Sequence, residues 1–274
     1  SFMTANGFNR FVEQKDFVNP AFVNAWGVSD EDLFNRALTE LDGLHAEGKP
    51  FLAMLLTVSN HRPFTYPDGR IDRPSSEQLR ENAVKYADWS LGMFFDKARQ
   101  HDWNKNTLFV VLGDHGARIY GSQLFPMRSY RVPVLMRRPD EIGKDTRCQT
   151  LASSLDLAPT VMGLLGGDYR SVFFGRDALH LPPEQGYALM QHNHDIAMLT
   201  SDRKLVVLDA RRQAWVYDFD ARSFALKPEP IPPKQRLRAA ISFFQAANRL
   251  YYDERLFPAL PSARRPEEMT NDER

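Results

Sequence analysis

The sequence predicts an α/β fold, in which a mainly parallel sheet is sandwiched by helices and followed by a small C-terminal subdomain of antiparallel strands plus one helix. Up to about residue 190, short apolar runs alternate with amphipathic runs, which is typical of buried parallel strands joined by helices. Beyond that point, short apolar runs follow one another closely, which indicates antiparallel strands. We therefore expect an α/β core over 1–190, a strand-plus-helix subdomain over 191–258 and a loose polar tail over 259–274.

The first helix is expected to run from Ser29 to about His45. Ser29 is suited to the N-cap, and Asp32 follows three residues later, before a helically spaced apolar face. Residues 48–50 (GKP) should end this helix. The continuously apolar run 51–56 (FLAMLL) then predicts a buried parallel strand that ends near His61.

The later elements follow from the same patterns. A long helix with one apolar face is expected over 76–100. Pro133 lies within the apolar run 132–136 and indicates an edge strand or a strand start there. The remaining expected elements are strands at 107–112, 132–136, 196–200, 204–208 and 214–217, and helices at 155–166 and 233–251.

Composition excludes several classes of function. The chain has 35 Lys plus Arg and 35 Asp plus Glu, so no overall charge favours nucleic acid as a partner. The single cysteine, Cys148, excludes an internal disulfide and is expected to be structural. The run 51–56 is the longest apolar one and is too short to cross a bilayer.

Polar residues follow two of the predicted parallel strands. His61 follows the first strand, and Asp114 and His115 follow the second. Ligands bind outside the carboxyl ends of strands in open parallel sheets, so these residues lie where a site is expected. Adjacent Asp and His side chains can offer one oxygen and one nitrogen to a divalent cation. The alternative interpretation is a turn with a capping Asp and a solvent-facing His.

The other histidines are weaker candidates. His45 and His101 lie at predicted helix ends, where a cation is favourable without any site. His192 and His194 alternate near a strand start, so a second metal or substrate contact is possible there. His180, in a proline-rich loop, is assigned no role.

Four motifs together resemble the lipoteichoic acid synthase and phosphoglycerol transferase family, within the sulfatase and alkaline phosphatase superfamily. They are 59–64 (SNHRPF), 114–115 (DH), 156–160 (DLAPT) and 174–177 (FGRD), and the resemblance covers about residues 1–220. It implies an alkaline-phosphatase-like fold. It also implies that Asp114 and His115 bind one divalent metal, most often Mn, with Mg, Zn or Ca as alternatives, and that His61 contacts the substrate phosphate, with Arg62 beside it.

The resemblance implies a metal-dependent phosphotransferase or phosphodiester hydrolase of the cell envelope, acting through a covalent threonine intermediate. In that family the nucleophilic Thr and a metal-binding Glu lie upstream of the point where this chain starts. We therefore expect a missing N-terminal half of the same domain. We also expect a membrane anchor through upstream helices, an extracytoplasmic or periplasmic location, and an anionic phospholipid or glycan head-group substrate.

One departure from the family concerns the substrate. Lipoteichoic acid synthases carry Phe-Trp-Asn-Arg where this chain has 2–5 (FMTA), so the resemblance does not imply glycerol phosphate itself. Trp26 could line a substrate pocket or be a structural aromatic residue. Two alternative functions stay open: a sulfate-ester hydrolase, although Cys148 lacks the sulfatase nucleophile context, and a non-catalytic anion-binding domain.

Overall fold

The computed structural model describes residues 2–117, 125–138, 147–230 and 234–253. Packing divides the chain into two units, and each is described by itself. Unit 1 comprises residues 1–111 and 135–144, and unit 2 comprises residues 112–134 and 145–274. The expected domain division at residue 190 stays a prediction.

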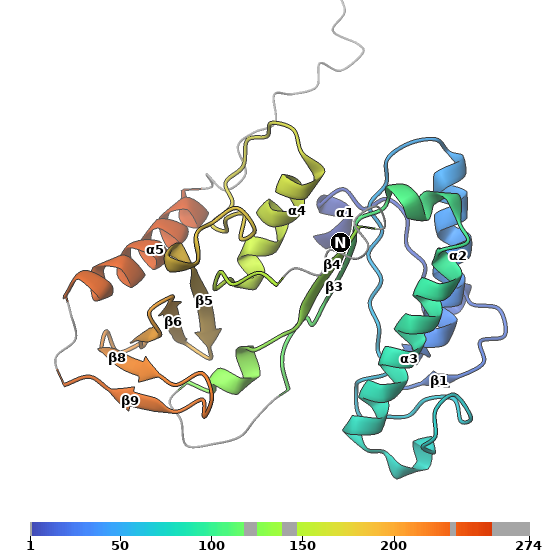
Figure 1. Ribbon diagram of the computed structural model, residues 1–274, viewed down its shortest axis with the longest axis horizontal. Coiled ribbons are helices and arrows are strands. Elements are labelled where there is room, and N and C mark those ends of the chain that lie inside the picture. Colours follow the sequence, from blue (N-terminus) through green and yellow to red (C-terminus); the bar gives the residue numbers. More distant parts are fainter. Residues whose placement is uncertain (1, 118–124, 139–146, 231–233, 254–274) are drawn as a thin grey trace, which may run out of the picture. The chain divides into compact units, whose positions relative to one another are not determined.

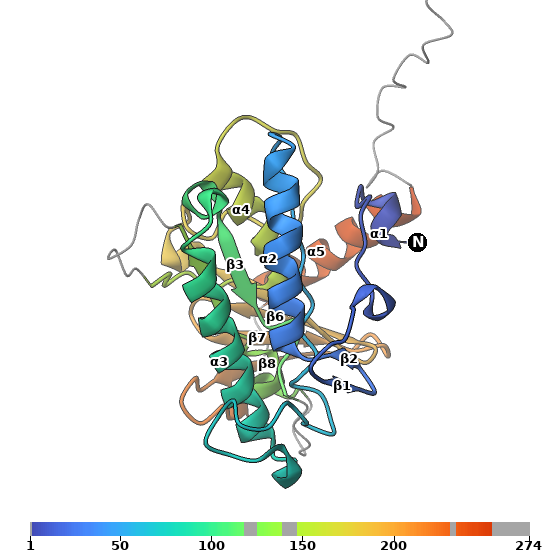
Figure 2. The ribbon, with the colours of Figure 1, turned by 90° about the vertical axis from the view of Figure 1, so that its right-hand side faces the viewer.

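Unit 1 is built on two long helices that lie side by side, α2 (Asp30–Ala46) and α3 (Arg80–Ala98) (Figure 1 and Figure 2). The Ser29 side chain accepts a hydrogen bond from Asp32 N, which confirms the predicted N-cap. Apolar side chains of both helices and of the turn after α3 form the core of this unit. They are Phe34, Leu38, Leu41, Phe94, Ala98 and Trp103.

The start of the second long helix differs from the expectation. A short 3-10 turn forms at Ser75–Glu77, and Gln78 adopts a left-handed backbone conformation with φ of 49°. Because an α-helix cannot continue through a left-handed residue, α3 begins at Arg80 rather than at residue 76. The other short elements of unit 1 are α1 (Phe2–Ala5) and the antiparallel pair of β1 (Val23–Asn24) and β2 (Gly27–Val28).

The prediction of a buried strand over 51–56 is wrong for this structure. The segment is extended, but it belongs to no strand ladder in the described part of the chain, and most of its side chains are exposed. The next two expected strands are confirmed. They are β3 (Phe109–Leu112) and β4 (Val134–Arg137), which pair with each other, and Pro133 directly precedes β4 as expected at a strand start.

Unit 2 contains a five-stranded antiparallel sheet in the order β5-β6-β7-β8-β9. This confirms the predicted C-terminal antiparallel strands, although the first strand starts earlier than residue 191. The strands are β5 (Tyr187–His192), β6 (Asp195–Thr200), β7 (Lys204–Leu208), β8 (Ala214–Phe219) and β9 (Leu226–Pro228).

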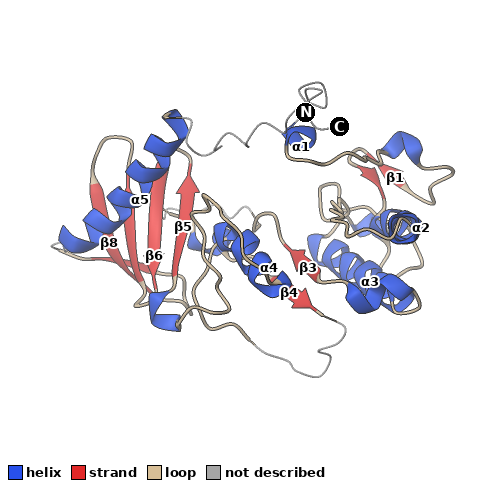
Figure 3. Ribbon diagram, turned by 90° about the horizontal axis from the view of Figure 1, so that it is seen from above, coloured by secondary structure: helices blue, strands red, loops and turns tan. Residues whose placement is uncertain are grey.

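Both faces of this sheet are covered. Helix α5 (Lys234–Tyr252) lies across one face, where Ala240 packs against Met198, Val206 and Val216 (Figure 3). The other face buries Leu205 and its neighbours against residues 125–130. Helix α4 (Leu157–Leu165) ends at Gly166, whose φ is 76°, at the expected position. In the described residues no helix has the length and apolar character needed to cross a bilayer.

Candidate active site

The loop that carries His61 is fastened to the first turn of α2. Asp30 Oδ1 accepts hydrogen bonds from Val58 N and Ser59 N, both at 3.0 Å, and from Ser59 Oγ at 2.8 Å. Asp30 and Ser59 are each only 1% exposed, so water cannot replace these bonds easily. His61 N in turn donates to Val58 O. The position of the His61 backbone therefore depends on one buried carboxylate.

His61, Arg62 and Trp26 form one cluster in unit 1. Trp26 lies in the turn between β1 and β2, and its ring lies 4.0 Å from the His61 ring, centroid to centroid, with a tilt of 32°. Its Nε1 donates to the Arg62 carbonyl at 2.6 Å. Trp26 is 52% exposed, which is unusual for a structural aromatic residue. The structure thus brings together the three predicted substrate-binding residues, while their role stays a prediction.

Asp114 and His115 lie directly after β3, in unit 2, and both are exposed. His115 Nδ1 is 3.0 Å from the carbonyl of Gly116, which can only accept, so Nδ1 must carry the hydrogen. In the neutral ring the lone pair then resides on Nε2, which is 3.6 Å from Asp114 Oδ2. Gly116 is required here because a Cβ would meet the Ser129 carbonyl oxygen at 2.2 Å.

This arrangement fits a divalent cation. Two ligand atoms 3.6 Å apart can both reach one ion at the usual bond length of about 2.1 Å. The hydrogen bond from His115 Nδ1 to a carbonyl is also typical of metal-ligating histidines, because it fixes the ring and its tautomer. Among the described residues no group of three or more His, Cys, Asp or Glu could hold a metal. The pair therefore offers two ligands and needs others to complete a site.

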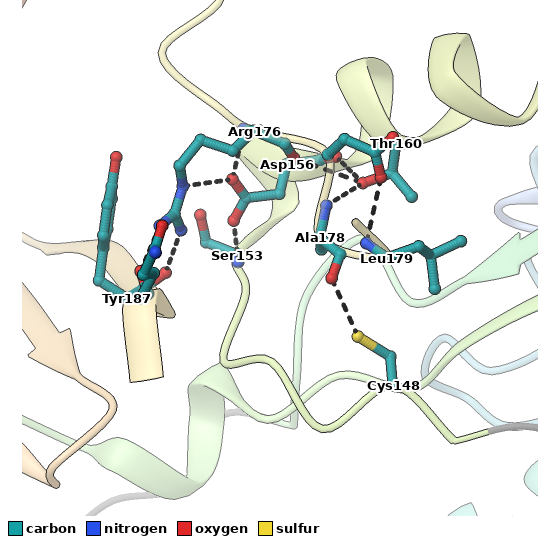
Figure 4. Close-up of polar contacts among 10 residues, drawn as sticks. Cys148, Ser153, Asp156, Thr160, Arg176, Ala178, Leu179 and Tyr187 are labelled. Atoms are coloured by element: carbon teal, nitrogen blue, oxygen red, sulfur yellow. Dashed lines mark hydrogen bonds and ion pairs between the residues drawn. The ribbon is translucent and has the colours of Figure 1, made fainter. Parts of the chain in front are cut away.

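Two further motifs of the resemblance have structural roles in unit 2 (Figure 4). Buried Asp156, before α4, accepts hydrogen bonds from Ser153 N at 2.8 Å and Arg176 N at 2.7 Å. The Arg176 guanidinium donates to the carbonyls of Gln185 and Tyr187 and lies 3.4 Å from the Tyr187 ring centroid. These contacts hold α4 to the start of β5. They explain the presence of Asp156 and Arg176 in the motifs without requiring that either residue contacts a substrate.

The remaining candidates have ordinary partners. His101 pairs with Asp42 at 2.6 Å, and His180 pairs with Asp177 at 2.7 Å. His192 packs edge-on against Phe125. Cys148 is exposed, and its thiol donates to the carbonyl of Ala178 in the network of Figure 4.

Comparison with known proteins decides the family. The sulfatase family model matches residues 1–167. The chain belongs to the sulfatase family. This sulfatase-family chain is 26% identical over 199 residues to a phosphoglycerol transferase I of Xanthomonas campestris pv. campestris, a match that includes 69% of this chain and 28% of the relative. A phosphoglycerol transferase I of Citrobacter koseri is 26% identical over 192 residues, which are 65% of this chain and 24% of that protein. The chain thus spans about a quarter of the length of these relatives.

Solved structures confirm the predicted alkaline-phosphatase-like α/β fold. A protein of the alkaline phosphatase superfamily from Vibrio parahaemolyticus superimposes with a TM-score of 0.81 at 36% identity, over 90% of this chain and 60% of that one. The lipoteichoic acid synthase LtaP from Listeria monocytogenes superimposes with a TM-score of 0.72 at 24% identity, over 90% and 65% of the respective chains. The phosphoglycerol transferases and the lipoteichoic acid synthase are named as enzymes, in agreement with the resemblance.

Sequence reasoning missed the role of Asp30. Asp30 was assigned no contact beyond its place in the helix expected from Ser29. Its contact with residues 58–59 joins segments 28 positions apart, and no local pattern encodes such a contact. The one available signal was Ser59, a small polar residue three positions after the apolar run 51–56.

Proposed function

We propose that this chain forms part of a metal-dependent phosphotransferase or phosphodiester hydrolase of the bacterial cell envelope. The observation that carries the proposal is the pair of Asp114 and His115, with His115 Nε2 and Asp114 Oδ2 3.6 Å apart and the ring fixed through Nδ1. The matches to phosphoglycerol transferases favour phosphate over sulfate as the group transferred.

Asp114 and His115 would bind one divalent cation in this proposal. A mixed set of oxygen and nitrogen ligands suits Mn²⁺ or Zn²⁺. The family resemblance favours Mn²⁺, with Zn²⁺, Mg²⁺ or Ca²⁺ as alternatives. When bound, the cation would act as a Lewis acid that polarises the phosphoryl group. Asp114 contributes the negative charge, and the Gly116 carbonyl keeps the His115 ring in the orientation that presents Nε2.

His61 is proposed to donate a hydrogen bond to a phosphoryl oxygen and so to stabilise the charge that develops during transfer. Stacking against Trp26 restricts rotation of the His61 ring, and the bond from Trp26 Nε1 to the Arg62 carbonyl fixes the two residues as a unit. Arg62 adds a positive charge next to the ring, which favours an anionic phospholipid or glycan head group as the substrate.

The nucleophile, proposed to be a threonine, and the remaining metal ligands are assigned to polypeptide outside this chain, in the other half of the same domain. Within the described residues Asp114 and His115 supply two ligands of such a site, and the match to the Xanthomonas relative includes 28% of that protein. We further propose that the whole protein is anchored in the inner membrane and acts on its extracytoplasmic face, as implied by the similarity to phosphoglycerol transferases and a lipoteichoic acid synthase.

The proposal is tested on the full-length protein to which this chain belongs. Hydrolysis of bis(p-nitrophenyl) phosphate is measured with and without Mn²⁺, beside p-nitrophenyl sulfate. Asp114→Ala and His61→Ala should each reduce phosphodiester turnover by about 100-fold or more. His194→Ala, which removes an exposed histidine in the turn between β5 and β6, is the matched control and should retain activity.

Each alternative function predicts a different result in this assay. Faster turnover of the sulfate ester would identify a sulfatase. No turnover of either ester, with binding of phosphate preserved, would identify an anion-binding domain. Unchanged phosphodiester turnover in Asp114→Ala and His61→Ala would contradict the proposed residue roles.

A further inference from the structure

Helix α5 carries exposed apolar side chains in addition to those that pack on the sheet of unit 2. Ile241 is 37% exposed, Phe244 50%, Tyr251 64% and Tyr252 74%. Their spacing along the helix places them on one side, with the polar Asn248 between them. These four residues are called the apolar row of α5. A row of exposed apolar side chains marks an interaction surface, whereas single exposed apolar residues are common.

The other side of α5 is already occupied. Ala240 is buried against the sheet, and Leu237 and Phe243 pack against the same cluster (Figure 3). The Phe243 ring lies 4.9 Å from the Tyr187 ring of β5, centroid to centroid. The helix is therefore fixed on the sheet, and the apolar row is the part that stays uncovered.

The charged side chains of α5 are all basic, because the sequence has no Asp or Glu between residues 234 and 252. The basic residues are Lys234, Arg236, Arg238 and Arg249. Two of them have acidic partners outside the helix. Arg236 pairs with Asp202, and Arg249 Nε lies 3.4 Å from Asp253 Oδ2.

The other two basic residues border the apolar row. Lys234 and Arg238 are exposed, and the described part of the chain places no carboxylate within ion-pair distance of either. They precede Ile241 by seven and three residues, so they project from the side of the helix that carries the row. Exposed aromatic residues beside unpaired basic residues are typical of helices that lie on anionic membranes.

We propose that this side of α5 docks on the surface of an anionic lipid bilayer. Phe244 and the two tyrosines enter the head-group region, which suits tyrosine because its ring is apolar and its hydroxyl polar. Lys234 and Arg238 meet the lipid phosphates. Because its other side stays packed on the sheet, α5 lies in the plane of the membrane surface and does not cross it.

A second copy of this chain fits the surface less well. Face-to-face contact of two copies would bring together two helices whose charged side chains are all basic, and like charges oppose association. Lysine is also depleted at protein–protein interfaces relative to the rest of the surface. An anionic bilayer instead complements both the charge and the aromatic character of α5.

Vesicle flotation of the 274-residue chain tests the docking directly. The vesicles are phosphatidylcholine alone, or phosphatidylcholine with about one third phosphatidylglycerol. Binding to the anionic vesicles should be at least about tenfold tighter than to the neutral ones, and should weaken at high salt. The assay contains neither metal nor substrate, so its outcome is independent of the proposed chemistry at Asp114 and His115.

A matched pair of variants tests the apolar row. Phe244→Ser should weaken binding to the anionic vesicles by about tenfold, because the ring no longer enters the head-group region. Phe11→Ser removes a phenylalanine of nearly equal exposure, 48% against 50%, from a loop of unit 1 and should leave binding unchanged. Both positions are exposed, so an unchanged Tm confirms that each variant is folded.

A second pair of variants tests the charges. Lys234→Glu with Arg238→Glu should weaken binding by about tenfold or more. Arg211→Glu with Arg212→Glu makes the same change in net charge in the exposed turn between β7 and β8, and should weaken it by less than about threefold. No preference for anionic vesicles, or binding that the α5 variants leave unchanged, would overturn the proposal. A dimer in sedimentation that Phe244→Ser dissociates would overturn it in favour of a second copy.

Discussion

Replacement of Asp30 tests how the His61 loop is held. Asp30→Ala removes the acceptor for Val58 N, Ser59 N and Ser59 Oγ. Hydrogen bonds to a charged group contribute about 1.5–3 kcal/mol each when their partners are buried. The two groups of Ser59 are buried, and the half-buried Val58 N adds less. We therefore expect a loss of about 3–4 kcal/mol in the free energy of unfolding.

Urea denaturation provides the measurement, with the free energy taken from the midpoint and slope. Asp30→Asn keeps an acceptor at the position of Oδ1 and loses only the charge, so it should cost about 1–2 kcal/mol. Asp88→Ala, at an exposed position on α3, should change stability by less than about 0.5 kcal/mol. If Asp30→Ala cost less than about 1 kcal/mol, or no more than Asp30→Asn, the argument from buried hydrogen bonds would be refuted.

Three further changes probe unit 2. A hydrogen bond from Arg236 holds the pKa of Asp202 at about 2, below its usual value of 3.8. Its contribution is therefore present above about pH 4 and lost as the pH falls through about 2. Asp202→Asn should cost about 0.5–1 kcal/mol at pH 7, and a pH series of urea melts should show this difference vanish in acid. Leu205 of β7 is fully buried, so Leu205→Ala leaves a cavity. It should lower the free energy of unfolding by about 2–5 kcal/mol, seen as a lower Tm. Asp156→Ala leaves Arg176 N and Ser153 N without their acceptor and should cost about 2–4 kcal/mol; an unchanged Tm would contradict the role of the network in Figure 4.

The sequence predicted those parts of the fold that local patterns encode. Ser29 caps α2 as expected, and closely spaced short apolar runs located β6, β7 and β8 of unit 2, but not β5 or β9. The prediction for 51–56 was wrong because a continuous apolar run indicates burial but does not identify what buries it. The start of α3 was missed because the left-handed conformation of Gln78 has no strong sequence signal.

The candidate site was predictable to a similar extent. Strand-end position predicted Asp114 and His115, which lie after β3 in a geometry that suits a cation. The same argument for His61 relied on a strand over 51–56 that the structure does not contain. The stacking of Trp26 on His61 was not predictable, because it joins residues 35 positions apart through the fold alone. The same reason applies to the hydrogen bonds that Asp30 accepts from Val58 and Ser59.

The most direct test of the account is whether Asp114 and His115 bind a divalent cation. Mn²⁺ is titrated into the ¹⁵N-labelled chain, and paramagnetic broadening of backbone amide signals reports even weak binding. We predict broadening centred on residues 113–116 that is lost in the Asp114→Asn, His115→Gln double variant. It should persist in the Asp177→Asn, His180→Gln variant, which removes another exposed histidine paired with an aspartate. Broadening centred elsewhere, or unchanged by the first double variant, would contradict the proposed metal site.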